Sequence, residues 1–210
     1  CNTVFGQLAM DLGGSRLVQQ AEAFGFNREI PFEWESLTGF FPSTGEFSAD
    51  LPAVAQSGLG QRDVQATPLL MAMVAATIAN GGEQMEPFMV TRIYDAAGGI
   101  VEEHEPSVWA TPVSPATADV VAGMMEQVVA SGTGTRAAVS GVRVAGKTGT
   151  AETEVSPPHA WFIGFAPLEN PSIALAVVVE EGGDAGESAT GGSVAAPIAQ
   201  QLFEYWLQRS

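Results

Sequence analysis

The sequence predicts an α+β fold in which helices cover both faces of an antiparallel sheet. Apolar residues recur at three- and four-residue spacing in several segments between Thr3 and Ala130, as in amphipathic or buried helices. Three β-rich runs then follow in close order, and a last amphipathic stretch ends the chain. Short connections between successive strands favour antiparallel pairing, whereas alternating βα units would favour a parallel sheet.

Four helical segments are expected before the sheet. The two short ones are separated by Gly13 and Gly14, and each longer one opens with a capping hydroxyl followed by proline, Thr67-Pro68 or Ser114-Pro115. Residues 27–52 hold scattered aromatics, prolines and glycines, so we expect an irregular connection there. The expected helices are residues 3–12, 15–24, 68–80 and 114–130.

The β pattern predicts one hairpin and one larger sheet. Residues 89–94 and 100–103 flank a turn that contains Gly98 and Gly99, as in a hairpin. The expected sheet strands are residues 142–152, 160–165 and 173–180. Residues 193–207 form the closing helix, and we expect Trp161, Phe162 and Phe165 to fill the space between it and the sheet.

The composition of the chain limits its size class and the kinds of partner that it can bind. The chain has 210 residues, of which 46% are hydrophobic and 15% charged, so it can bury the core of one domain or of a large part of one. A net charge of −16 repels the phosphates of nucleic acids, which excludes them as partners. No stretch approaches the roughly 20 apolar residues that span a bilayer, so a membrane anchor is expected outside these residues.

Lys147 is the only lysine in the chain and admits two interpretations. It completes a formal match to the phosphate-binding pattern G-x-x-x-x-G-K-[ST] over residues 141–148. A phosphate loop needs a helix that starts at the lysine, whereas Val142 and Val144 alternate as in a strand and Gly149 follows. The second interpretation places Lys-Thr-Gly-Thr on a strand beside a cleft, where the ammonium and hydroxyls bind a carboxylate and an amide stabilises an oxyanion. We favour the strand and keep a P-loop nucleotide hydrolase as a remote alternative.

The Lys147-Thr-Gly-Thr sequence resembles the K-T-G motif of penicillin-binding proteins and serine β-lactamases. Further segments look like the class B penicillin-binding proteins, in the order that this family shows. They are Gly58-Leu-Gly-Gln61, Ala66-Thr-Pro-Leu-Leu-Met-Ala72 and His159-Ala-Trp-Phe-Ile-Gly-Phe-Ala-Pro167. The resemblance covers most of the chain and is nearest to the actinobacterial penicillin-binding protein A type. It implies the penicillin-binding protein/serine β-lactamase-like fold, with residues 1–210 as the C-terminal part of a single transpeptidase domain.

The family's other motifs are incomplete in this chain. Its members use S-x-x-K for the nucleophile and proton acceptor, then S-x-N, then K-T-G. The chain cannot contain S-x-x-K, because its one lysine already belongs to K-T-G, and it contains no S-x-N. The resemblance implies that Cys1-Asn2-Thr3 ends a Ser-Cys-Asn version, with the serine immediately before Cys1. Asn2 is then the amide that binds the substrate backbone, or alternatively a helix N-cap.

The resemblance also implies the chemistry and its setting. Lys147 supplies positive potential, Thr148, Gly149 and Thr150 bind the donor peptide, and the amide of Thr150 stabilises the oxyanion. The reaction is D,D-transpeptidation at D-Ala-D-Ala, inhibited by β-lactams, with no metal or organic cofactor. The implied partners are peptidoglycan stem peptides, β-lactam antibiotics, cell-wall synthesis or division proteins and the missing N-terminal part of the same protein. The implied location is the extracytoplasmic face of the bacterial cell membrane.

Several alternatives stay open at this point. A β-lactamase or D,D-carboxypeptidase of the same fold would transfer the acyl group to water. A non-catalytic member would only bind penicillin or muropeptides, as a sensor. As an isolated fragment the chain is expected to be inactive, and Cys1, its only cysteine, is a candidate for a disulfide with an upstream cysteine.

Overall fold

The computed structural model describes residues 2–47, 50–153 and 155–209. Its helices are α1 (Asn2–Leu12), α2 (Gly14–Ala23), α3 (Thr44–Phe47), α4 (Leu51–Ser57), α5 (Pro68–Ala79), α6 (Pro115–Ser131) and α7 (Ala196–Leu207). Its strands are β1 (Gln84–Met85), β2 (Arg92–Tyr94), β3 (Ile100–Glu103), β4 (Val108–Ala110), β5 (Ala145–Ala151), β6 (His159–Ala166) and β7 (Ile173–Val179). Short helical turns are η1 (Thr135–Ala137), η2 (Glu180–Ser188) and η3 (Gly191–Ala195).

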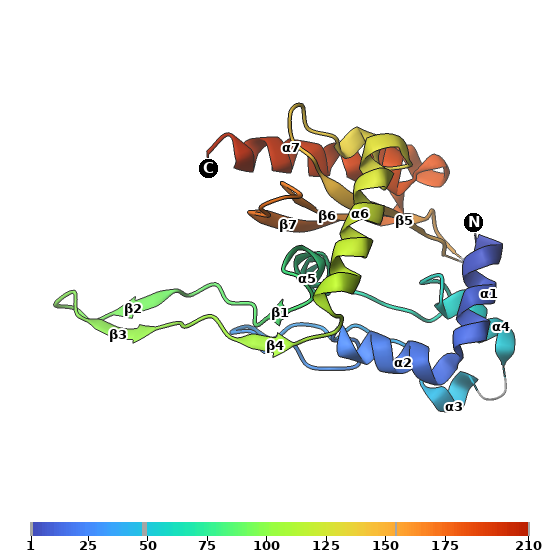
Figure 1. Cartoon of the computed structure of the whole chain (residues 1–210), viewed down its shortest axis with the longest axis horizontal. Helices are drawn as coiled ribbons and strands as arrows, with labels where there is room; N and C mark the ends of the chain where they lie inside the picture. The colour runs from blue at the N-terminus through green and yellow to red at the C-terminus, as the bar shows by residue number, and fades with distance from the viewer. Residues whose placement is uncertain (1, 48–49, 154, 210) are drawn as a thin grey trace.

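The centre of the molecule is the antiparallel sheet β5-β6-β7. Helix α7 packs on one face of this sheet, and α5 and α6 pack on the other (Figure 1). Helices α1 to α4 lie together at one side, and the hairpin of β2 and β3 projects from the other side. This layering confirms the predicted α+β class with helices on both faces.

The sheet has the three predicted strands, and one of their boundaries is shifted by more than one residue. In the pairing of β5 with β6, Lys147 lies opposite Ile163 and Gly149 opposite Trp161. Strand β5 begins at Ala145, later than the predicted residue 142, because a tight turn with Gly141 at φ 76° precedes it. Among the strands that the structure describes, β6 is the one that pairs with β5, so β5 is an edge strand.

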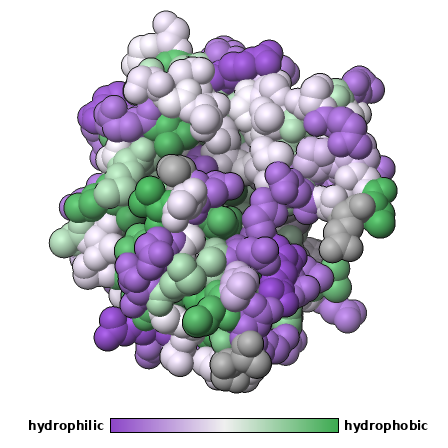
Figure 2. Space-filling model, turned by 90° about the vertical axis from the view of Figure 1, so that its right-hand side faces the viewer, coloured by the Kyte–Doolittle hydropathy of each residue, from purple (hydrophilic) through white to green (hydrophobic). Residues whose placement is uncertain are grey.

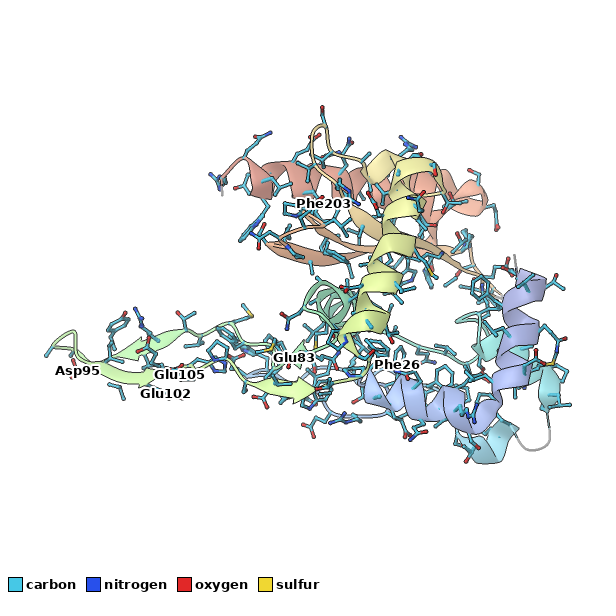
Figure 3. The ribbon with its side chains drawn as sticks, viewed as in Figure 1. Phe26, Glu83, Asp95, Glu102, Glu105 and Phe203 are labelled. Atoms are coloured by element: carbon cyan, nitrogen blue, oxygen red, sulfur yellow. The ribbon has the colours of Figure 1, made fainter. Side chains whose placement is uncertain are left out.

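The aromatic residues of β6 are divided between the two faces of the sheet. Phe162 is fully buried against Phe203 of α7, with ring centroids 6.5 Å apart (Figure 3 labels Phe203). Phe165 packs instead with Ile78 and Met125 on the opposite face, and Trp161 lies on that face as well. The expectation that all three fill the space under the closing helix is therefore wrong for Trp161 and Phe165. Successive strand residues point to opposite faces, which the aromatic content alone does not reveal.

The long helices begin where the capping pattern predicts. The Thr67 hydroxyl accepts a hydrogen bond from the Leu70 amide at 3.1 Å, and Ser114 caps α6 in the same way through the Thr117 amide. Helix α7 begins at Ala196, three residues later than predicted. The residues before it form the π-helical turn η3, which opens on a capping box between Thr190 and Ser193.

The predicted irregular segment, residues 27–52, contains helix α3 and the start of α4. Both were missed by the sequence analysis. Helix α4 has a recognisable start, because the Asp50 carboxylate accepts a hydrogen bond from the Ala53 amide and Pro52 occupies the first turn. The scattered aromatics are also organised, since Phe26, Phe41 and Phe47 make edge-to-face contacts.

The predicted hairpin is confirmed and forms a projecting arm. Strands β2 and β3 pair antiparallel with a register shift after Ile93, and all of their residues are exposed. Figure 3 labels Asp95 and Glu102 along this arm. A small sheet of β1 and β4, in which Gln84 lies opposite Ala110, forms the base of the arm and was not predicted from the sequence.

The surface near α1 mixes hydrophobic and hydrophilic patches. Figure 2 looks onto the side of the molecule where α1 and α4 lie, and several separate hydrophobic patches are visible on it. Val4, Phe5 and Leu8 of α1 are exposed. Among the described residues, none of the helices combines the length and apolar character needed to cross a bilayer.

Candidate active site

A cleft of about 270 Å³ lies along β5. One wall is the strand itself, from Lys147 to Ala151, together with Trp161 and Ile163 of β6. The other walls come from elements distant in sequence, namely Phe26, the segment after α4 and Met71 of α5. The structure therefore places Lys147, Thr148, Gly149 and Thr150, the four predicted residues of the K-T-G strand, at one cleft.

The outer edge of β5 presents backbone groups to this cleft. In an antiparallel ladder, the N–H and C=O of alternate residues point toward the same neighbour. The Thr150 carbonyl accepts a hydrogen bond from Gln61 Nε2 at 3.1 Å, so it points away from β6. The Thr148 carbonyl, two residues earlier, accepts from Lys147 Nζ at 2.5 Å and points the same way. The amides of these two threonines consequently face the free edge as well, where a bound acyl group can reach them.

Lys147 extends from the middle of β5 into the cleft. Its side chain is reached by solvent, yet the cleft walls remove part of the water that would surround a free ammonium group. This desolvation lowers the pKa of Lys147 below the ordinary value of 10.5. The group is a cation in a semi-enclosed site, which strengthens its attraction for an anionic ligand.

The hydroxyl of Thr148 is held by a residue outside the K-T-G sequence. Thr148 Oγ1 and Thr133 Oγ1 share a hydrogen bond of 2.7 Å, and Thr133 lies just after α6. Each hydroxyl has one proton and can also accept, so a Thr148 that accepts from Thr133 keeps its own proton for a carboxylate. Thr133 is therefore a positioning residue for the strand.

The segment that leads into α7 packs tightly against β5 and β6. A Cβ atom on Gly191 would lie 2.1 Å from the Trp161 carbonyl oxygen and 2.5 Å from that of Gly149. A Cβ atom on Gly192 would lie 2.3 Å from the Thr133 carbonyl oxygen. Only glycine allows this approach, so the strand that carries Lys147 is supported from the side that faces α7.

Asn2 lies apart from this group. It is exposed in the first turn of α1, and it does not line the cleft as far as the chain is described. Its connection to β5 is indirect, because α1 packs on α4 and the segment after α4 carries Gln61. The structure thus joins four of the five predicted site residues and leaves Asn2 as a prediction. Cys1, the residue of the disulfide hypothesis, lies outside the described residues.

The structure contradicts the nucleotide interpretation of this region. Lys147 lies inside a seven-residue strand and not at the start of a helix, so the phosphate-loop alternative is wrong. Across residues 2–47, 50–153 and 155–209, no group of three or more His, Cys, Asp or Glu side chains is arranged to hold a metal ion.

Three residues of the site were missed by the sequence analysis. Gln61 was noticed as part of a family-like segment but was given no role, and Trp161 was assigned to the wrong face. Thr133 had no assigned role either, although it lies in the glycine-rich Gly132-Thr133-Gly134 sequence directly after a predicted helix. Glycines on both sides of a residue indicate that another segment approaches the backbone closely, but they do not identify that segment.

Comparison with known proteins identifies relatives over nearly the whole chain. Residues 1–204 match the family described as penicillin binding protein transpeptidase domain. The chain is 41% identical over 211 residues to the peptidoglycan D,D-transpeptidase PbpA of Mycolicibacterium smegmatis, a match that covers 95% of this chain and 40% of that protein. It is 39% identical over 219 residues to PbpA of Mycobacterium tuberculosis, covering 99% of this chain and 42% of that protein. The chain thus spans about two-fifths of the length of these relatives.

Solved structures agree with the sequence matches. The D,D-transpeptidase domain of a peptidoglycan glycosyltransferase from Eggerthella lenta superimposes with a TM-score of 0.90 at 37% identity, covering 99% of this chain and 51% of that one. Penicillin-binding protein A from M. tuberculosis, solved as a ceftriaxone acyl-enzyme, gives a TM-score of 0.90 at 36% identity, covering 97% and 46%. The chain therefore belongs to the penicillin-binding protein transpeptidase family, within its class B, and closely resembles mycobacterial PbpA.

Proposed function

We propose that this chain is the C-terminal part of a serine D,D-transpeptidase domain that cross-links peptidoglycan stem peptides and is a target of β-lactams. One observation carries the proposal: Lys147-Thr-Gly-Thr lies on the free edge of β5 and lines a cleft. The relatives named as D,D-transpeptidases and the β-lactam acyl-enzymes among the similar structures support it.

In this proposal each residue of the strand has a role. Lys147 supplies positive potential beside the donor peptide, and the hydroxyls of Thr148 and Thr150 bind its terminal carboxylate. The Thr150 amide is one of two donors to the oxyanion. Asn2 hydrogen-bonds the substrate backbone.

The nucleophile comes from a segment that these residues do not contain. A serine oxygen attacks the carbonyl carbon of the D-Ala-D-Ala bond, the C–N bond breaks, and D-alanine leaves with the proton. An amine of a neighbouring stem peptide then attacks the serine ester, forms the new amide and releases the serine. Since the only lysine here belongs to β5, both the serine and the lysine of S-x-x-K are supplied from elsewhere. The 210-residue chain alone is therefore expected to be inactive.

The cellular setting follows from the substrate. Peptidoglycan is cross-linked outside the cytoplasm, so we place the domain at the extracytoplasmic face of the membrane, anchored by a segment outside this chain. Proteins of cell-wall synthesis or division are its proposed partners.

A product analysis tests the proposal. The complete domain, in which this chain is joined to the segment with the nucleophile, is incubated with a stem peptide ending in D-Ala-D-Ala and a D-amino acid as acceptor. Mass spectrometry is expected to detect a product that has lost D-alanine and gained the acceptor. A domain that forms no such product and no covalent adduct with penicillin would contradict the proposal and favour a non-catalytic binding protein.

The same preparation separates transferase from hydrolase. A transpeptidase is expected to keep a fluorescent penicillin label, because its acyl-enzyme reacts slowly with water. Rapid loss of the label with continued consumption of penicillin would indicate a β-lactamase. Release of D-alanine with only a water-hydrolysed peptide would indicate a carboxypeptidase.

A further inference from the structure

A side chain from outside the sheet occupies the free edge of β5. Gln61 Nε2 donates a hydrogen bond to the Thr150 carbonyl at 3.1 Å, across a sequence separation of 89 residues. This hydrogen bond reaches the carbonyl from the side of β5 that faces away from β6. The edge of β5 is thus capped at the position where a ligand would extend the sheet.

The turn that carries Gln61 is built to hold it in place. Gly60 and Arg62, on either side, both have positive φ angles, of 73° and 64°. Such a conformation is disfavoured for a residue with a side chain and persists only where the surroundings enforce it. Here the Arg62 guanidinium is held by Asp50 at 2.9 Å and by Asp63 at 3.2 Å. The backbone N–H of Gln61 also donates a hydrogen bond to the backbone carbonyl of Gln56 at 3.1 Å.

An extended ligand needs the carbonyl that Gln61 covers. Peptides that bind beside an exposed edge strand pair with its outward N–H and C=O groups. A stem peptide or a penicillin with an acylamino group can donate an N–H to the Thr150 carbonyl. A ligand without that N–H cannot donate a hydrogen bond to this carbonyl and leaves the hydrogen bond from Gln61 intact.

We propose that Gln61 is a specificity-determining residue that closes the β5 edge and is displaced by ligands whose amide N–H takes its place on Thr150. The inference rests on the proposed function, because it concerns ligands of the same cleft. A ligand with this N–H replaces the hydrogen bond from Gln61 to Thr150 with its own, so it gains little net hydrogen bonding. Gln61 therefore reduces the difference in acylation rate between ligands that have the N–H and ligands that lack it.

Two β-lactams and two substitutions test this role in the complete domain. Penicillin G carries an acylamino N–H on its β-lactam ring, and imipenem carries a hydroxyethyl group at the same ring position. Gln61→Met keeps the length of the side chain and removes the donor. It is expected to raise the second-order acylation rate constant for penicillin G by about 2- to 10-fold, the value of one neutral hydrogen bond. The constant for imipenem is expected to change by less than about 2-fold.

Controls separate the cap from a general effect on folding. Gln61→Asn retains the amide but is one methylene shorter, so it is expected to behave like Gln61→Met. Gln19→Met, at an exposed position of α2, is expected to leave both rate constants unchanged. Melting temperatures of all variants check that the fold is retained.

The outcomes are distinguishable from those of the proposed function. An equal change for both β-lactams, or a lower constant for penicillin G, would overturn the inference and leave the transpeptidase intact. Gln61→Asn behaving like the wild type would also overturn it. A wild-type domain that forms no adduct with either β-lactam would overturn the proposed function and the inference together.

Discussion

The β5-β6-β7 sheet and the β2-β3 arm are both antiparallel, yet they differ in what surrounds them. Phe162 and Phe165 in the sheet are almost completely buried, whereas all residues of β2 and β3 are exposed. Figure 3 shows the arm standing clear of the helices, with Asp95, Glu102 and Glu105 labelled along it. The cleft lies along the sheet and not along the arm. The comparison teaches that a strand lines a cleft where other elements support it, as α6 and η3 support β5, whereas an unsupported pair of strands stays exposed.

The largest expected effect is on the core of the sheet. Phe162→Ala removes a fully buried ring that contacts Phe203, and we expect a loss of about 3–5 kcal/mol of unfolding free energy. Val101→Ala on the arm, where the side chain is 66% exposed, is expected to change it by less than about 0.5 kcal/mol. Urea denaturation measures both. Similar losses in the two variants would remove the distinction between the regions.

The second largest effect is expected where the segment before α7 packs against β5. Gly191→Ala places a methyl group within 2.1 Å of the Trp161 carbonyl oxygen, so we expect a loss of about 3 kcal/mol and slower acylation by penicillin. The matched control is Gly123→Ala in α6, where nothing lies within 4 Å of the new methyl group. Equal melting temperatures for the two variants would show that the close approach at Gly191 is unimportant.

The charge of Lys147 sets a pH dependence. Since desolvation lowers its pKa, the ammonium loses its proton at a lower pH than an exposed lysine would. If the cation is the active form, acylation falls as the pH rises through this lowered value, below 10.5. Lys147→Arg keeps its charge over this range. The ratio of the wild-type rate to the Lys147→Arg rate is therefore expected to fall with rising pH, and a constant ratio would contradict this role.

A smaller effect is expected from the ion pairs at the start of β5. Arg143 binds Glu126 at 2.5 Å and Glu169 at 2.6 Å, and its hydrogen bonds lower the pKa of both carboxyl groups below 4.5. Carboxylates with lowered pKa values stabilise the fold above their unfolded values, and this contribution is lost as the pH falls through the folded values. Because Arg143 and Glu169 are exposed and Glu126 is only partly buried, Arg143→Met is expected to cause only a small loss.

Denaturation at two pH values checks this sign. The difference in unfolding free energy between wild type and Arg143→Met should be smaller at about pH 3 than at about pH 7, because the carboxylates lose their charge as the pH falls through their lowered pKa values. A difference of the same size at both pH values would mean that Arg143 acts through packing and not through its charge.

Local patterns in the sequence predicted most of the fold. The pairs Thr67-Pro68 and Ser114-Pro115 gave the starts of the long helices, because capping depends only on neighbouring residues. The three sheet strands followed from β-branched and aromatic runs. The faces of β6 could not be assigned from content, so Trp161 and Phe165 were placed wrongly.

The sequence predicted the site residues that lie together on strand β5, but not those contributed by other elements. Lys147 to Thr150 form a continuous motif, and the sequence located them together. The contacts that complete the cleft join Thr133 to Thr148 and Gln61 to Thr150, across separations of 15 and 89 residues. Such contacts depend on tertiary packing, which a local pattern does not specify. Asn2 stays a prediction because it does not line the cleft in the described part of the chain.

The most direct test of the account is the acylation of the complete domain by penicillin with and without the ammonium of Lys147. For Lys147→Met, we predict a fall in the second-order rate constant of about 100-fold or more, with an unchanged melting temperature. Arg143→Met, which also removes one cation but lies away from the cleft, should keep the wild-type rate constant. A Lys147→Met domain that is acylated within about 2-fold of the wild-type rate would contradict the central claim that β5 presents this lysine to an acyl donor.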